Sequence, residues 1–143
     1  MGRSEVNMKI MQINLWTGRI KYPLRKFISK EGVDVLCGQE AVWKEGDQEQ
    51  IENLFTTVDQ IKSFGKFRDD FRTANMGMKL GDGVMMMGNV VMSRGVITEK
   101  EEKLVHGEPN LEDGKMINHA YFAQKVVIEG IVVVNYHGYW KPE

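Results

Sequence analysis

The chain has 143 residues, of which 42% are hydrophobic and 27% charged, a composition typical of one globular domain. Nineteen basic and twenty acidic residues give a net charge of −1, which excludes a general positive field that would attract nucleic acid. The single cysteine, Cys37, excludes a disulfide within the chain and lies in an apolar run, so we expect a buried structural thiol. The apolar stretches are too short to span a bilayer, and the first residues lack the apolar core of a signal peptide, so we expect a cytoplasmic protein.

The first third of the chain predicts a parallel pair of strands. Residues 8–14 form an apolar run that favours a buried strand ending at Asn14. Pro23 stands near the first turn of a short helix, Gly32 is its expected stop, and its apolar face comprises Leu24, Phe27 and Ile28. Residues 33–37 predict a second strand, and strand, helix, strand in this order is typical of a βαβ unit.

The middle of the chain predicts one long helix, a loop and a strand. Asp47 and Gln50 are spaced as in a capping box, and five apolar residues follow at helical spacing: Ile51, Leu54, Phe55, Val58 and Ile61. Residues 64–83 have no steady period and several glycines, so we expect a loop there. Residues 84–92 predict a third strand, in which Gly88 indicates a bulge or a close approach of another backbone.

The last third predicts a charged excursion followed by a hairpin. Residues 97–113 are rich in charge, and we expect them to be solvated. Two apolar runs, residues 120–128 and 131–136, flank Glu129-Gly130. A two-residue connection that contains glycine is typical of a β-hairpin.

Four short motifs lie at or near the ends of these apolar runs. They are Asn14-Leu15-Trp16, Gln39-Glu40, residues 88–94 and Asn135-Tyr136-His137. Ligands of open α/β sheets bind at the carboxyl ends of the strands, so a sheet can gather these distant residues into one site. Asn, Glu and His gathered in this way suit a hard divalent metal and a phosphate.

Each of the three main candidates also has a simple structural interpretation. Glu40 could hold Mg²⁺ through its carboxylate, or be a solvated loop residue. Asn14 could orient a metal-bound water or donate to a phosphate oxygen, or only end a strand in a turn. His137 could donate a hydrogen bond to developing charge or act as an acid or base, or pair structurally with a carboxylate or the backbone.

Other residues near the motifs are weaker candidates. Arg94 could bind a phosphate, but an arginine just past a strand is usually solvated. The three tryptophans could wall a substrate pocket or pack in the core. Between residues 64 and 72 aromatic residues are interleaved with basic ones: Phe64, Lys66, Phe67, Arg68, Phe71 and Arg72. This pattern would suit stacking on nucleic-acid bases and binding of the phosphate backbone. A loop held in place by its phenylalanines explains the pattern equally well.

The four motifs, in this order, resemble those of the endonuclease/exonuclease/phosphatase superfamily, which has the DNase-I-like fold. The resemblance covers essentially the whole chain, but only the first half of that family's domain. It implies an α/β sandwich, here the amino-terminal half, with a mixed sheet and flanking helices over residues 1–143. It also implies hydrolysis of a phosphodiester or phosphomonoester with Mg²⁺ or Mn²⁺. By resemblance Glu40 and Asn14 are the metal-site residues, and His137, Asn14 and Asn89 the catalytic set, with Asn89 in a supporting role.

The sequence departs from the family in several places. Some nuclease members carry an acidic residue where this chain has Trp16, and His137-Gly138 replaces the usual His-Leu. The family's later Gly-Asp-Phe-Asn and Ser-Asp-His motifs, which supply the water-activating residue and a second histidine, do not occur. We therefore expect the chain alone to be nearly inactive and to self-associate or pair with a missing carboxy-terminal half, because half a sandwich exposes apolar surface.

The substrate class stays open at this point. Nucleic acid, a sugar phosphate, a lipid phosphate and a sphingomyelin-like diester are all compatible with the resemblance. A non-catalytic module that binds a phosphate group or a partner is the second interpretation. An unrelated α/β domain, with Asn14, Glu40 and His137 far apart, is the third.

Overall fold

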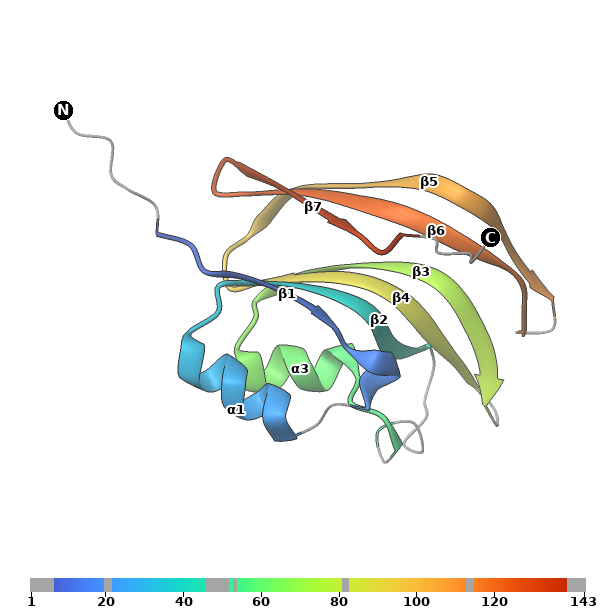
Figure 1. Cartoon of the computed structure of the whole chain (residues 1–143), viewed down its shortest axis with the longest axis horizontal. Coiled ribbons are helices and arrows are strands. Elements are labelled where there is room, and N and C mark those ends of the chain that lie inside the picture. The colour runs from blue at the N-terminus through green and yellow to red at the C-terminus, as the bar shows by residue number, and fades with distance from the viewer. Residues whose placement is uncertain are drawn as a thin grey trace.

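The structure, a computed structural model, describes residues 7–19, 22–45, 52, 54–80, 83–112 and 115–138. Two β-sheets pack face to face, and helices α1 (Tyr22–Glu31) and α3 (Val58–Gly65) cover the outer face of one of them (Figure 1). The four-stranded sheet has the order β1-β2-β4-β3 and the three-stranded sheet the order β5-β6-β7. The expected α/β sandwich with flanking helices is confirmed.

The amino-terminal part of the chain forms the expected parallel pair. Strand β1 (Ile10–Asn14) pairs in parallel with β2 (Val35–Glu45), and α1 (Tyr22–Glu31) connects them after the short 3₁₀ helix η1 (Trp16–Gly18). Helix α1 ends before Gly32, whose φ of +62° is the left-handed conformation that favours glycine at this position.

Two details of this part differ from the sequence prediction. Phe27 is 49% exposed, because only Leu24 and Ile28, four residues apart, face the sheet. Strand β2 does not end at Cys37 but continues through a β-bulge, visible as a shift in its register with β4 (Gly83–Ser93) between Gly38 and Ala41.

The second described helix is shorter than the sequence suggests. Helix α3 (Val58–Gly65) begins after Thr57, whose side chain accepts a hydrogen bond from the Gln60 amide while the Gln60 side chain accepts one from the Thr57 amide. This capping box fixes the start of the helix. Leu54 is exposed and precedes that start, so it is not part of the buried face. The expected cap at Asp47 and Gln50 lies outside the described residues.

The loop expected over residues 64–83 is wrong, because most of it is strand β3 (Asp69–Leu80), antiparallel to β4. The alternation of apolar and polar residues expected of a strand is hard to see in this sequence. Arg72 occupies a position that faces the helices, where an apolar residue would be expected, and it is neutralised there by Asp59 and Asp70. The close approach expected at Gly88 is confirmed: a Cβ atom there would clash with the Thr73 carbonyl oxygen.

The expectation for residues 97–113 is correct in one part only: residues 98–108 are exposed, as expected, but the segment is not a loop excursion. These residues form β5 (Ile97–Glu112), which pairs with β6 (Lys115–Ile128) as an edge strand. Charged residues are a common protection of edge strands against association, so charge alone did not indicate a loop. The hairpin between β6 and β7 (Ile131–Tyr136) is confirmed, with positive φ angles at Glu129 and Gly130 as a type I′ turn requires.

The central strands β2 and β4 of the four-stranded sheet are largely buried on both faces. Its outer side chains pack under the helices in one core: Leu36, Val90 and Met92 with Leu24, Ile28, Val58 and Ile61. Its inner side chains pack against the three-stranded sheet in a second core: Val35, Cys37 and Val91 with Ile97, Val126, Ile128 and Val133. The expected buried thiol is confirmed, and burial raises the pKa of Cys37 to about 11. None of the described helices is long and apolar enough to cross a membrane.

Candidate active site

The four motifs meet at one level of the sandwich. Asn14 is in register with Gln39 on the neighbouring parallel strand, and Val90 is opposite Gly38. From the other sheet, the Asn135 side chain donates to the carbonyl oxygens of Gly38 and Val90, at 3.2 Å each. We call this region the strand junction and define it by Asn14, Gln39, Glu40, Asn135 and His137.

Asn14 ends β1 at the strand junction with its side chain exposed to solvent. Its Oδ1 accepts a hydrogen bond of 2.8 Å from the Trp16 amide, which fixes the direction of the side chain. The next amide, of Leu15, donates to the Gln39 carbonyl oxygen at 2.8 Å and ties the end of β1 to β2. Because neighbouring strands lie about 4.8 Å apart, the Asn14 backbone runs beside the segment that carries Glu40.

Glu40 lies in the β2 bulge rather than at a strand end. It is half-buried and has a φ of +51°, a conformation that residues with a Cβ seldom adopt. Trp16 and Thr17, immediately after Asn14, have φ angles of +47° and +52°. Three non-glycine residues with left-handed backbone therefore lie around one point, and bulges and such backbone strain both gather at functional sites.

His137 follows β7 and is half-buried between two exposed neighbours. It comes two residues after Asn135, whose side chain points between the sheets to the Gly38 carbonyl oxygen. Since side chains alternate along a strand, His137 continues the inner side of β7 at the strand junction. The structure thus places Asn14 at the end of β1, Glu40 in the β2 bulge beside it and His137 just after β7.

A buried chain of side-chain amides joins the two sheets at the strand junction. Gln39 Nε2 donates to Asn135 Oδ1 at 2.6 Å, and Asn135 Nδ2 donates to Gln124 Oε1 at 3.0 Å. Gln124 Nε2 in turn lies 3.0 Å from Thr73 Oγ1 and 3.2 Å from the Asn89 carbonyl oxygen. Sequence reasoning missed Gln124, although an amide inside the apolar run of β6 was a usable signal. These amides hold the β2 bulge against β7.

Asn89 is fully buried between the sheets, where its Nδ2 donates to the Phe122 carbonyl oxygen. Its Oδ1 is buried and has no hydrogen-bond partner among the described residues. This position fits the supporting role expected for Asn89 better than contact with a substrate.

The tryptophans and Arg94 lie in different places in the structure. Trp43 is buried in the core, whereas Trp16 is 60% exposed at the strand junction, with the Arg19 guanidinium 5.7 Å from its ring centroid. Trp140 lies outside the described residues. Arg94 is at the opposite end of β2, where its amide donates to the Asp34 carbonyl oxygen and its Nε to that of Gly65.

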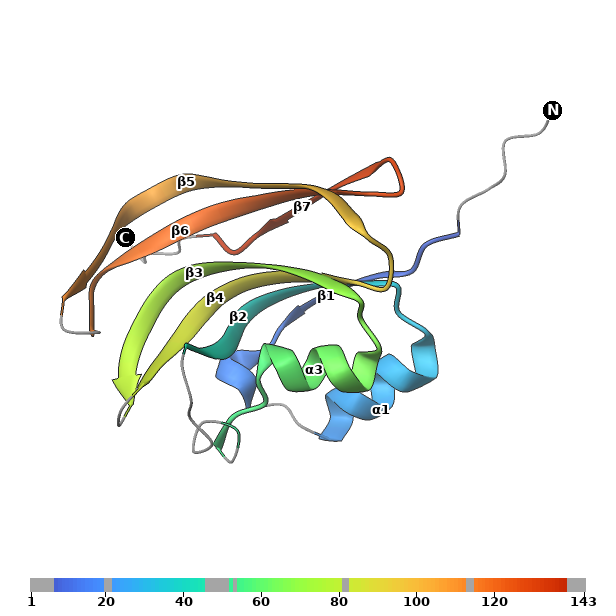
Figure 2. The ribbon, with the colours of Figure 1, turned by 180° about the vertical axis from the view of Figure 1, so that it is seen from behind.

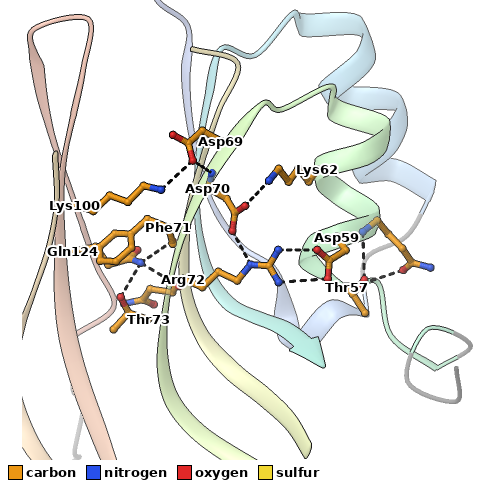
Figure 3. A network of polar contacts seen from close by, with 12 residues as sticks. Thr57, Asp59, Lys62, Asp69, Asp70, Phe71, Arg72, Thr73, Lys100 and Gln124 are labelled. Carbon is orange, nitrogen blue, oxygen red and sulfur yellow. Dashed lines mark hydrogen bonds and ion pairs between the residues drawn. The ribbon is translucent and has the colours of Figure 1, made fainter. Parts of the chain in front are cut away.

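The alternating aromatic and basic residues between 64 and 72 are largely used within the fold. Phe67 and Phe71 pack in the two cores. Arg72 binds Asp59 at 2.7 Å and Asp70 at 2.6 Å, and Lys62 binds Asp70 at 2.6 Å (Figure 3). These contacts fasten α3 to β3, so Phe67, Phe71 and Arg72 are used within the fold, whereas Lys66 and Arg68 are exposed.

The donor groups of the strand junction suit a hard cation only in part. Among the residues that the structure describes, no three His, Cys, Asp or Glu side chains form a cluster that could hold a metal. One carboxylate, that of Glu40, is compatible with Mg²⁺ or Mn²⁺, because Mg²⁺ commonly uses one or two protein carboxylates and keeps several waters. The residues present therefore fit a metal that completes its shell with water and substrate oxygens.

Comparison with known proteins supports the fold. No protein-family model matches the chain, and no curated protein matches it by sequence. The structure is similar to that of an endonuclease/exonuclease/phosphatase family protein from Leptotrichia buccalis C-1013-b, with a TM-score of 0.52 and 14% sequence identity. The similarity covers 94% of this chain and 54% of that one. The chain therefore has the architecture of about half of that protein, and at this identity the likeness concerns the fold alone.

Proposed function

We propose that the chain forms the amino-terminal half of a divalent-metal-dependent phosphoester hydrolase. One observation carries the proposal: Asn14 and Glu40 lie on adjacent parallel strands at a point where the backbone is left-handed at Trp16, Thr17 and Glu40. The partial similarity in fold to an endonuclease/exonuclease/phosphatase family protein supports it.

In this proposal each residue of the strand junction has one task. Glu40 holds Mg²⁺ or Mn²⁺, which when bound supplies charge that polarises the phosphoryl oxygen. Asn14, fixed through its bond to the Trp16 amide, donates from its Nδ2 to a phosphate oxygen. His137 donates a hydrogen bond as charge develops on the phosphate. The attacking water has no matched base in this sequence, so the chain alone should turn over little substrate.

Metal binding gives a test that does not depend on activity. We expect Mg²⁺ to raise the melting temperature of the chain, and Glu40→Gln to abolish that rise, since a ligand that binds only the folded state adds about 2.7 kcal/mol at a hundred times its Kd. Glu45→Gln is the matched control, because it removes an exposed carboxylate from the same strand. Equal Mg²⁺ stabilisation of the wild type and Glu40→Gln would remove Glu40 from the metal site.

A second candidate function is a non-catalytic module that binds a phosphate group or a partner through the strand junction. The exposed Trp16 ring, with the Arg19 guanidinium over it, favours this alternative, because such a pair offers a flat surface and a cation without a metal. Binding of a phosphoester that is unchanged by EDTA and lost in Trp16→Ala would support it against the hydrolase.

We also propose that the three-stranded sheet is a contact surface for a second copy of the chain or for a carboxy-terminal half. Val132, Val134 and Tyr136 are exposed along the edge strand β7. Sedimentation of the purified chain tests this proposal. A monodisperse monomer with no bound partner would contradict it.

A further inference from the structure

A groove between the two helices lies on the opposite side of the four-stranded sheet from the three-stranded sheet. Helices α1 and α3 lie side by side below that sheet in Figure 1 and, seen from behind, in Figure 2. The groove has a volume of about 740 Å³. Small-molecule sites typically measure about 300–1,000 Å³, so the groove has room for such a ligand.

The groove is lined by cations and neutral polar groups. Helix α1 contributes Arg25 and Ser29, and the α3 side contributes Gln60, Ser63 and Lys66. The described residues that line it include no carboxylate. The hydroxyl groups can donate to an anion, and a guanidinium offers the forked donor geometry that suits phosphate.

Two acidic residues near the groove, Asp59 and Asp70, form ion pairs with other residues. Asp59 on α3 pairs with Arg72, and Asp70 on β3 pairs with Lys62 and Arg72 (Figure 3), and none of these residues lines the groove. Neither Arg25 nor Lys66 forms an ion pair with another described residue. Among the described residues, nothing compensates these two positive charges of the groove, in a chain whose net charge is −1.

An aromatic ring lies beside one of these charges. The Arg25 guanidinium is 6.0 Å from the ring centroid of Phe64, which also lines the groove and is half-buried. The ring restricts where the guanidinium lies and offers a flat apolar surface next to it.

We propose that this groove binds a phosphorylated small molecule of nucleotide size, with Arg25 and Lys66 on its phosphates and Phe64 against its planar part. Glu40 does not line the groove, so this site and the proposed hydrolase can fail independently. Surface cations also steer anions non-specifically, and the test must separate that effect from a site.

Calorimetric titration at low salt provides the test, with ADP as the probe and adenosine as its uncharged counterpart. The test variant is Arg25→Gln/Lys66→Gln. The matched control is Lys26→Gln/Lys30→Gln, which removes the same charge from exposed positions on α1 outside the groove. Circular dichroism melts confirm that both variants fold, and Glu40→Gln should leave ADP binding unchanged.

We expect saturable ADP binding and no detectable adenosine binding. The test variant should bind ADP at least about tenfold more weakly, which is the loss of about 1.4 kcal/mol, and the control should stay within about threefold of wild type. Absence of saturable ADP binding, or an equal loss in both variants, would overturn the proposal. Tighter binding of a single-stranded oligonucleotide than of ADP would overturn the assignment to a small molecule.

Discussion

The outer faces of the two sheets differ sharply, although their inner faces form one shared core. Helices α1 and α3 cover the outer face of the four-stranded sheet, where Leu36 is fully buried. No helix in the described part of the chain covers the outer face of the three-stranded sheet, as both views show (Figures 1 and 2). There Val132 and Val134 are 57% and 63% exposed, while Val133 between them is buried.

This difference shows that similar apolar runs can occupy very different environments. Strand β2 is buried on both faces over residues 35–39, as expected of a central strand in a parallel or mixed sheet. Strand β7 is almost as apolar, but alternates between buried and exposed because only its inner face has a partner. Apolar sequence in β7 is thus surface available for association rather than core.

The largest expected effect on stability comes from truncating a side chain that is buried between helix α1 and the four-stranded sheet. Ile28→Ala on α1 should lower the free energy of unfolding by about 4 kcal/mol, because the side chain is fully buried under the four-stranded sheet. Val134→Ala on the bare face should cost less than about 0.5 kcal/mol. Urea unfolding of both variants measures this, and a large loss in Val134→Ala would show that the bare face is covered in solution.

The contact between the two sheets can be tested at its polar centre. Asn135→Ala should cost about 3 kcal/mol, because it removes four buried hydrogen bonds and leaves Gln39 and Gln124 without those partners. Gln12→Ala, which removes an exposed amide from β1, is the control and should be nearly neutral. Equal stability of the two variants would mean that the amides do not hold the sheets together.

Low pH should weaken the contact between α3 and the four-stranded sheet, because it protonates Asp70. Burial disfavours the charged Asp70 carboxylate, but the bonds from Lys62 and Arg72 outweigh burial, so the pKa of Asp70 lies below its ordinary value. A lowered pKa adds stability that is present above the unfolded-state value of about 3.9 and is lost as the pH falls through the folded-state value.

The variant Asp70→Asn isolates this contribution. It should be less stable than wild type at neutral pH and lose less stability on acidification, because the asparagine has no proton to take up. Melting temperatures measured from pH 7 down to pH 2 give both slopes. If melting temperature falls with pH equally in wild type and Asp70→Asn, Asp70 does not couple folding to protonation. Glu45→Gln, which removes an exposed carboxylate, is the control.

The smallest expected effect concerns the start of α3. Thr57→Ala removes one side of the capping box and should cost about 1 kcal/mol. Thr57→Ser keeps the hydroxyl and should recover most of that loss. Amide hydrogen exchange along α3 locates the change, and unchanged protection at Gln60 would contradict a capping role.

Local patterns predicted much of the fold at specific places. The βαβ unit and the hairpin turn at Glu129-Gly130 were predicted because each depends on neighbours along the chain, and the close approach at Gly88 because a glycine within a strand often marks one. The polar residues of the strand junction were also named from the sequence, although their catalytic and metal-binding roles remain predictions. Strand β3 was missed because Arg72 is neutralised by Asp59 and Asp70, which only the packing of α3 against β3 reveals.

The sequence by itself determined the βαβ unit, the glycine turns at Gly32 and Gly130 and the burial of the apolar runs near β2, since hydrophobic periodicity and glycine conformation act locally. Only the tertiary structure decided that Glu40 sits in a bulge beside Asn14, that Gln124 joins the sheets, and that one face of β7 is bare. These features depend on strand register and on what packs across the sheet, so residues far apart in the chain set them together.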